Sequence, residues 1–169
     1  MSVTASLVIG ADGSTSLQGS SAGITSPEDR HNFLARRRQS DVIIIGGVTA
    51  RHEGYRRTPA PLIVLSHTYP EIVGVNPNAY WWNLAPLEAI KRATTEFGSS
   101  IFIEGGASMI QELLSVGAIS QLDLSITAAS GGENRVVLSE LLLNFNKITK
   151  SELNGTIFYS CTDPIRLQK

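Results

Sequence analysis

The sequence has few features that would set it apart from ordinary globular proteins. Only one of its 169 residues is a cysteine, Cys161, so an internal disulfide is excluded and a reducing compartment is indicated. No apolar run approaches the roughly 20 residues that a membrane span needs. Residues 1–6 show neither the basic segment nor the apolar core of a signal peptide. These absences exclude a membrane partner and predict a cytoplasmic protein.

An excess of charge of either sign is also missing. Lysine and arginine total 14, aspartate and glutamate total 15, and the net charge is −1. The longest basic run is Arg36-Arg37-Arg38, which excludes nucleic acid as a partner. The length fits a single domain over residues 1–169, large enough to bury roughly 70% of its unfolded surface.

Several motifs of known chemistry are absent. The dinucleotide fingerprint Gly-x-Gly-x-x-Gly and the phosphate loop that ends in Gly-Lys-Ser/Thr do not occur. The three histidines, His31, His52 and His67, lack metal-ligand spacing, and no Cys-x-x-Cys exists, so no metal site is predicted. A chain with ligand-binding turns but no metal site suits a reductase, in which a cofactor carries the chemistry.

Two strands that end in paired glycines organise the chain. Residues 101–106, IFIEGG, are an apolar strand, an acidic residue and two glycines before a helix, and residues 42–47, VIIIGG, follow the same pattern. Such a turn exposes backbone N–H groups at a helix start, which suits a phosphate or pyrophosphate. Thr49 and Ser108 follow the two turns and are candidates to cap the helices or to bind a phosphate. We predict a ligand across the carboxyl edge of an α/β sheet.

The region before the first turn predicts a loop and a helix. Residues 14–23 are small, polar and glycine-rich, which indicates either a loop that folds over a ligand or a plain surface connection. Thr25-Ser26-Pro27-Glu28-Asp29 indicates a helix start, with Thr25 or Ser26 as N-cap and Glu28 in the capping-box position. The helix is expected to run to about Gln39.

The remaining pattern alternates between strands and helices. The residues at 80–82 fit either a strand or core aromatics, and Asn154-Gly155 predicts a hairpin turn between strands at 147–153 and 156–162. We therefore expect an α/β fold with a mostly parallel sheet, flanking helices and a C-terminal antiparallel hairpin. Other strands are expected at 5–9, 42–45, 62–65, 101–103 and 122–128, and helices at 86–97, 108–116 and 138–142.

Two charged groups have more than one interpretation. Glu104 ends an apolar strand and should be partly buried, where it needs partners. It either bonds N–H groups of its loop or binds a polar ligand. The arginines at 36–38 fit a solvated helix end, but one of them could reach a ligand phosphate at the sheet edge.

Several stretches together resemble the riboflavin-biosynthesis reductase domain, the carboxy-terminal half of the bifunctional deaminase–reductase. They are Ala11-Asp12-Gly13, Ile24 to Arg30, Asp41 to Gly46 with Thr49, and Ile103-Glu104-Gly105-Gly106 through Gly117. The resemblance covers most of residues 3–130 and implies the dihydrofolate-reductase-like fold. It also implies that NADPH reduces 5-amino-6-(5-phosphoribosylamino)uracil, with hydride transfer to the ribose C1′ of an opened imine.

The resemblance also implies roles for individual residues. The residues implied to contact the substrate are Ser21, Arg37 and Glu104. Arg37 would bind the substrate phosphate, and Glu104 would be catalytic. A homodimer is implied by the relatives alone, since nothing in the residues marks an interface. The NADPH-binding residues are implied to be Thr49, Ser66, Gly105, Gly106, Ala107, Ser108 and Met109.

Two alternatives remain, because the substrate-side motifs depart from the family pattern. Ser14 replaces a basic residue, and Glu53-Gly54-Tyr55 replaces Asp-Asp-Pro. One alternative is a dihydrofolate- or pterin-type reductase, with Asp29 in the place of the proton-relay acid; Asp29 also has a plain role beside the helix dipole. The other is a catalytically silent nucleotide-binding domain.

Overall fold

The strands at the centre of the sheet are those whose residues are apolar at nearly every position. In the computed structural model, β2 (Val42–Gly46) pairs in parallel with β3 (Leu62–Leu65) and with β5 (Ser100–Glu104). Val42 and Ile44 face one core cluster, and Ile43 and Ile45 face the other. Side chains of a strand alternate between the two faces, so β2 is covered on both sides, as its sequence predicts.

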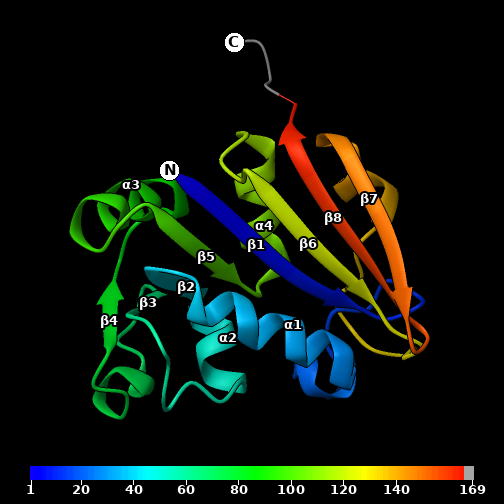
Figure 1. Ribbon diagram of the computed structural model, residues 1–169. Helices are drawn as coiled ribbons and strands as arrows, with labels where there is room; N and C mark the ends of the chain where they lie inside the picture. Colours follow the sequence, from blue (N-terminus) through cyan, green and yellow to red (C-terminus); the bar gives the residue numbers. More distant parts are fainter. Residues whose placement is uncertain (166–169) are drawn as a thin grey trace.

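The structure describes residues 1–165 and contains one eight-stranded sheet in the order β4-β3-β2-β5-β1-β6-β8-β7 (Figure 1). Neighbouring strands from β4 to β6 are parallel, whereas β8 is antiparallel to both β6 and β7. The predicted parallel α/β sheet with an antiparallel hairpin is therefore confirmed. The other strands are β1 (Ser2–Ile9), β4 (Ala79–Trp82), β6 (Gln121–Ile126), β7 (Phe145–Leu153) and β8 (Thr156–Pro164).

Helices cover the two faces of this sheet. Cluster residues on one face come from α3, α4 and α5, and on the other from α1 and α2 (Figure 1). No helix within residues 1–165 is long and apolar enough to cross a membrane. The α-helices are α1 (Pro27–Arg38), α2 (Gly47–His52), α3 (Pro86–Glu96), α4 (Ala107–Ser115) and α5 (Leu138–Leu142), and the 3-10 turns are η1 (Ser21–Gly23) and η2 (Glu71–Gly74).

The structure corrects two predictions about how the helices begin. Ser26 caps α1 by accepting the Asp29 N–H at 3.1 Å, and Glu28 does not complete a capping box but accepts a hydrogen bond from Asn154. Gly46 and Gly106 are the N-caps of α2 and α4, without a side-chain bond, so neither Thr49 nor Ser108 caps a helix. Both hydroxyls lie inside a first turn, and a cap must precede it.

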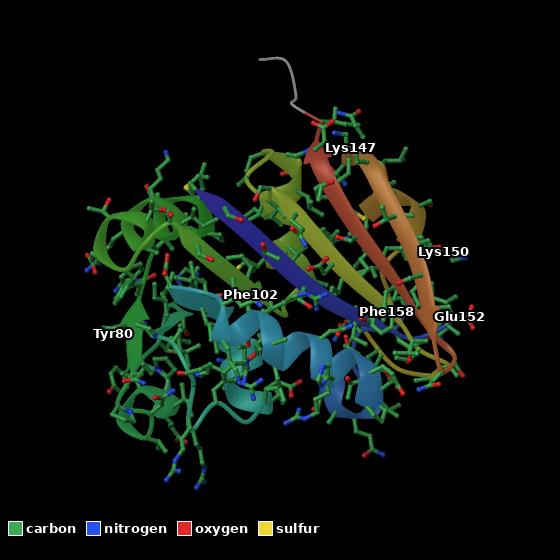
Figure 2. All side chains as sticks on the ribbon, in the orientation of Figure 1. Tyr80, Phe102, Lys147, Lys150, Glu152 and Phe158 are labelled. Carbon is green, nitrogen blue, oxygen red and sulfur yellow. The ribbon has the colours of Figure 1, made fainter. Side chains whose placement is uncertain are left out.

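The C-terminal hairpin forms at the predicted turn. Asn154 and Gly155 have φ values of 50° and 79°, which suit the primed turns that join twisted strands. Edge strand β7 is exposed from residue 146 to 153, and Lys147, Lys150 and Glu152 project from it (Figure 2). Charged side chains on an edge strand oppose pairing with further strands. The turn is fastened to the start of α1, because Thr156 Oγ1 donates to Ser26 Oγ at 2.8 Å.

The core implies a stability prediction for β2. Ile44 is 1% exposed in the central strand, and we expect Ile44→Ala to lower the free energy of unfolding by about 2–5 kcal/mol through lost burial and a cavity. Ile148 on β7 is 42% exposed, so Ile148→Ala should change the free energy of unfolding by at most about 0.5 kcal/mol. Urea unfolding measures both variants, and similar losses would contradict the layered core.

Candidate functional site

The two glycine turns lie side by side at the carboxyl edge of the sheet. They end the neighbouring parallel strands β2 and β5. Gly105 and Gly106 have φ values of +66° and +70°, a conformation that residues with a side chain rarely adopt. A Cβ atom on Gly105 would lie 3.4 Å from Thr49 Oγ1, and one on Gly106 would lie 3.8 Å from it. Thr49 of α2 therefore packs against the second turn, and the structure joins the two turns that the sequence indicated.

The second turn opens into the N-terminus of α4. Gly106 provides no side-chain cap, and the first N–H bonded within the helix is that of Ile110, to the Gly106 carbonyl at 3.1 Å. The preceding N–H groups, on Ala107, Ser108 and Met109, have no intrahelical acceptor, and the helix dipole gives them positive charge. The Met109 side chain is buried in the core, so only its backbone N–H remains for a ligand. The arrangement suits a pyrophosphate.

Ser66 lies on the other side of the first turn. A Cβ atom on Gly47 would come within 2.8 Å of Ser66 Oγ and 3.5 Å of Arg51 Nη1. A side chain at position 47 would collide with the Ser66 side chain, so glycine favours the close approach of α2 to the end of β3. The predicted cofactor residues thus lie on three consecutive strand ends, those of β3, β2 and β5.

Glu104 is 1% exposed and has three hydrogen-bond donors around it. Arg37 binds both carboxylate oxygens, Nε to Oε1 at 2.7 Å and Nη2 to Oε2 at 2.6 Å. The Tyr55 hydroxyl donates to Oε2 at 2.8 Å. The Arg37 guanidinium also lies over the Tyr55 ring, 4.8 Å from its centroid. Two predicted substrate residues, Glu104 and Arg37, therefore bind each other, and neither is presented as a free charge.

Burial dominates the electrostatics of this cluster. It raises the pKa of the Glu104 carboxyl, and hydrogen bonds and charge from Arg37 oppose the rise. Burial, assisted by the negative charge of Glu104, raises the pKa of the Tyr55 hydroxyl well above its ordinary value of 10.0. A paired, hydrogen-bonded ion is tolerated in such a site, whereas either ion alone would be costly.

Ser21 in η1 and Asp29 at the start of α1 have hydrogen-bond partners other than the three residues of this cluster. Asp29 is 5% exposed and accepts a hydrogen bond from Thr25 Oγ1 at 2.6 Å. The Ser21 N–H donates to the Glu53 carboxylate at 2.7 Å. Residues 19–23 have the spacing Gly-x-Ser-x-Gly, but they form a loop and not the strand-to-helix elbow that hydrolases use. The roles of both residues stay predictions.

Sequence reasoning missed three residues that shape this edge. Tyr55 completes the Glu104 cluster, and Glu53 and Glu133 accept hydrogen bonds from the loop at 16–21. Their sequence signal is weak, because Glu53 and Tyr55 stand out only as departures from a family motif. Glu133 lies in a Gly-Gly-Glu-Asn segment that reads as an ordinary chain break.

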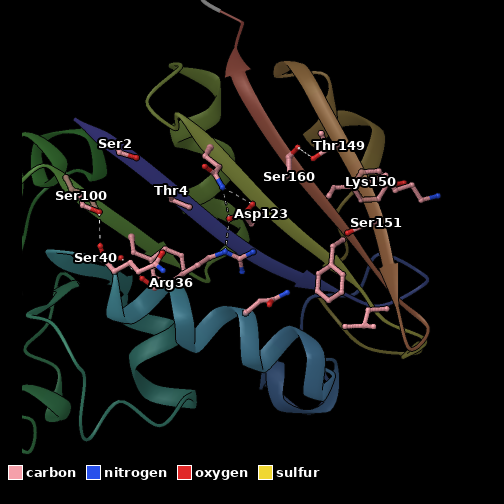
Figure 3. A pocket seen from close by; sticks show the side chains of 18 residues that line it. Ser2, Thr4, Arg36, Ser40, Ser100, Asp123, Thr149, Lys150, Ser151 and Ser160 are labelled. Carbon is pink, nitrogen blue, oxygen red and sulfur yellow. Dashed lines mark hydrogen bonds and ion pairs between the residues drawn. The ribbon is translucent and has the colours of Figure 1, made fainter.

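A hollow of about 690 Å³ lies elsewhere, on the α1 side of the sheet between α1 and the β7–β8 hairpin (Figure 3). Arg36 and Asp123 form an ion pair at 2.7 Å within it, and Ser2 and Thr4 line its floor. None of the predicted site residues lines this hollow. The hollow and the glycine turns are therefore separate features of the molecule.

The buried ion pair predicts a large loss of stability on truncation. Arg37→Ala leaves Glu104 buried without its cation, and the free energy of unfolding should fall by about 3–5 kcal/mol. Arg38, the exposed neighbour, provides the matched control, since Arg38→Ala should change the free energy of unfolding by at most about 0.5 kcal/mol. Chemical denaturation compares the two, and equal effects would contradict a structural role for the pair.

The raised pKa of the Tyr55 hydroxyl predicts a loss of stability in alkali. Above pH 10.0, the ordinary value, unfolded Tyr55 ionises while the folded residue keeps its proton. The folded state then binds more protons, so the free energy of unfolding decreases as the pH rises through this range. Tyr55→Phe should flatten the decrease, and Tyr80→Phe, at an exposed residue, should leave it unchanged. Denaturation at several pH values measures the slopes; the same slope in all three proteins would refute this assignment.

A family model covers most of the chain. Residues 1–156 match the model of the RibD C-terminal domain. A pyrimidine reductase-like protein from Corynebacterium diphtheriae has a similar structure, with a TM-score of 0.70 and 19% identity, covering 98% of this chain and 92% of that one. No curated protein matches the sequence at a significant level.

A second solved structure is that of a diaminohydroxyphosphoribosylaminopyrimidine deaminase/5-amino-6-(5-phosphoribosylamino)uracil reductase from Thermotoga maritima. It has a TM-score of 0.70 and 16% identity over 97% of this chain, which spans 56% of the Thermotoga protein. At these identities the two structures establish the dihydrofolate-reductase-like fold, and the family model establishes the lineage. The chain belongs to the RibD C-terminal domain family, the reductase family of riboflavin biosynthesis that its motifs resemble.

Proposed function

We propose that this chain is an NADPH-dependent reductase. The observation that carries the proposal is the pair of adjacent glycine turns, with open N–H groups where α4 begins at the second turn. Gly105, Gly106 and the backbone of residues 107–109 would hold the pyrophosphate, and Thr49 would lie beside it. Ser66, at the end of β3, would lie near the adenosine ribose. When bound, NADPH supplies the hydride and the two electrons of the reduction.

The proposed substrate is an aminopyrimidine whose exocyclic nitrogen carries a ribose. The reference compound is 5-amino-6-(5-phosphoribosylamino)uracil, which the name of the Thermotoga relative includes. Hydride would be added at C1′ of the opened imine, and a proton would complete the ribitylamino product. The protein would contribute mainly by holding the two carbons in register and by excluding water.

The substrate side would be built by Ser21, Arg37 and Glu104. Because Glu104 neutralises the charge of the Arg37 guanidinium and fixes its direction, the pair would act as one unit and not as two free charges. We propose Glu104 as a catalytic carboxylate on this basis. A homodimer and a cytoplasmic location remain predictions that rest on the resemblance and the composition.

A pterin-type reduction is the second candidate, and one observation favours it. Asp29 is a buried carboxylate in the first turn of α1 with a hydroxyl donor, Thr25, on one of its oxygens. A carboxylate in this position is suited to deliver a proton to a heterocycle. Turnover of dihydropterin but not of the aminopyrimidine would favour this function. A silent domain would turn over neither.

The cofactor assignment predicts the effect of a bulky residue at the second turn. Gly106→Trp should abolish NADPH binding, because the indole would occupy the pyrophosphate position. It should also abolish NADPH oxidation with the ribosylaminouracil, offered with and without its 5′-phosphate. Fluorescence quenching of NADPH measures binding, and NADPH absorbance measures turnover.

The control for this variant is a glycine with the same backbone strain. Gly117 has a φ of +64° and no atom within 4 Å of its Cβ position, so Gly117→Trp introduces comparable strain at the far end of α4. Gly117→Trp should bind NADPH as the wild type does. Unimpaired NADPH binding by Gly106→Trp would remove this turn from the cofactor site, and no binding by the wild type would reject the reductase.

A further inference from the structure

Two carboxylates accept the hydrogen bonds that the loop at residues 16–21 donates. Glu53 accepts the Ser21 N–H at 2.7 Å and the Ser20 hydroxyl at 3.3 Å. Glu133 accepts the N–H groups of Gln18 and Gly19 at 3.2 and 3.3 Å. The Ser16 hydroxyl also donates to Glu133, at 3.1 Å. This loop therefore presents backbone N–H and hydroxyl donors, and carboxylate oxygens accept their hydrogen bonds.

Such donors are those with which a loop binds a phosphate. Consecutive N–H groups with nearby hydroxyls form an anion site, and charge-assisted hydrogen bonds strengthen it. Residues 17–20 form a tight turn in which Gln18 and Gly19 have φ values of 52° and 80°. In this protein the anions of that site are Glu53 and Glu133, so a substrate phosphate would have to displace one of them.

Glu53 lies close to the proposed site. Its N–H donates to the Thr49 carbonyl at 3.0 Å, one helical turn away, and Thr49 is the residue that packs against Gly105. His52, the preceding residue, would be 3.5 Å from a Cβ atom on Gly19. The end of α2 thus links the cofactor turn to the loop that carries Ser21.

Glu53 and Glu133 have no cation within ion-pair distance among residues 1–165, and Arg51, Arg56 and Arg57, which lie near Glu53 in the sequence, form no ion pair with it. Arg37, the residue that the resemblance places on the phosphate, is neutralised by Glu104, and Arg135 is paired with Asp12. A phosphate monoester carries a charge of about −1.5 to −2 near pH 7 and would be repelled by an adjacent carboxylate.

We propose that Glu53 selects against a phosphate group, so that this chain reduces a ribosylaminopyrimidine without a 5′-phosphate. The proposal rests on the proposed reductase function and specifies its substrate class. Glu53 is then a specificity-determining residue. It accepts the Ser21 N–H and the Ser20 hydroxyl, so these two donors are not available to an anion.

The experiment compares 5-amino-6-ribosylaminouracil with and without its 5′-phosphate. The wild type should show a kcat/KM for the unphosphorylated form at least about tenfold higher, because like charges oppose binding of the other form. Glu53→Gln keeps an acceptor for Ser21 but removes the charge, and it should reduce this preference by about tenfold. Glu88→Gln removes an exposed carboxylate in the first turn of α3 and should leave the preference unchanged. NADPH binding confirms that each variant is intact.

A second measurement separates this proposal from the proposed function. Glu53→Ala empties the acceptor position, so inorganic phosphate should raise its melting temperature but not that of the wild type. If neither uracil compound is reduced, the reductase assignment fails, and the phosphate response alone decides whether Glu53 blocks an anion site. A wild-type preference for the phosphorylated substrate would overturn the proposal. It would also be overturned by an unchanged preference in Glu53→Gln, or by identical phosphate responses of the wild type and Glu53→Ala.

Discussion

The buried ion pair between Arg37 and Glu104 is the interaction on which the arrangement of the site depends. Helix α1 carries few apolar residues, so hydrophobic burial alone does not fix its place on the sheet. Consecutive arginines provide the attachment instead: Arg36 pairs with Asp123 of β6, and Arg37 pairs with Glu104 of β5. Because an unpaired carboxylate inside the protein is costly, only one placement of α1 satisfies both strands.

This attachment also determines where the ligand turn begins. Glu104 immediately precedes Gly105, so the carboxylate that fixes α1 also fixes the backbone from which the turn departs. Two successive residues with positive φ then point the chain into α4, and Thr49 packs against the turn from the neighbouring strand end. Local glycine chemistry shapes the turn, and a long-range ion pair sets its position. The proposed pyrophosphate site would need both to be rigid.

The parts of the fold that sequence could predict are those whose cause is local. The apolar residues of β2, the glycines that end β2 and β5, and the Asn154-Gly155 turn each dictate structure through near neighbours, and all three are found. The pairing of Arg37 with Glu104 joins residues 67 positions apart, and no periodicity predicts it. The capping box failed for a different reason: Thr25 and Ser26 were both possible N-caps, and with Ser26 in that place Glu28 is one residue too early to complete the box.

The two halves of the site differ in how much sequence change they tolerate. The proposed cofactor half would be made of backbone N–H groups, a helix end and glycine conformations, so many side chains around it could vary while the motif stays recognisable. The proposed substrate half would depend on side chains: Arg37 and Glu104 lie on α1 and β5, whereas Glu53, Tyr55 and Glu133 lie outside the strands and add contacts without disturbing the sheet. Loops tolerate such exchanges at little cost in stability. A reductase of this architecture could therefore retain a cofactor site and change its substrate, and the proposed function fits altered substrate-side motifs beside intact glycine turns.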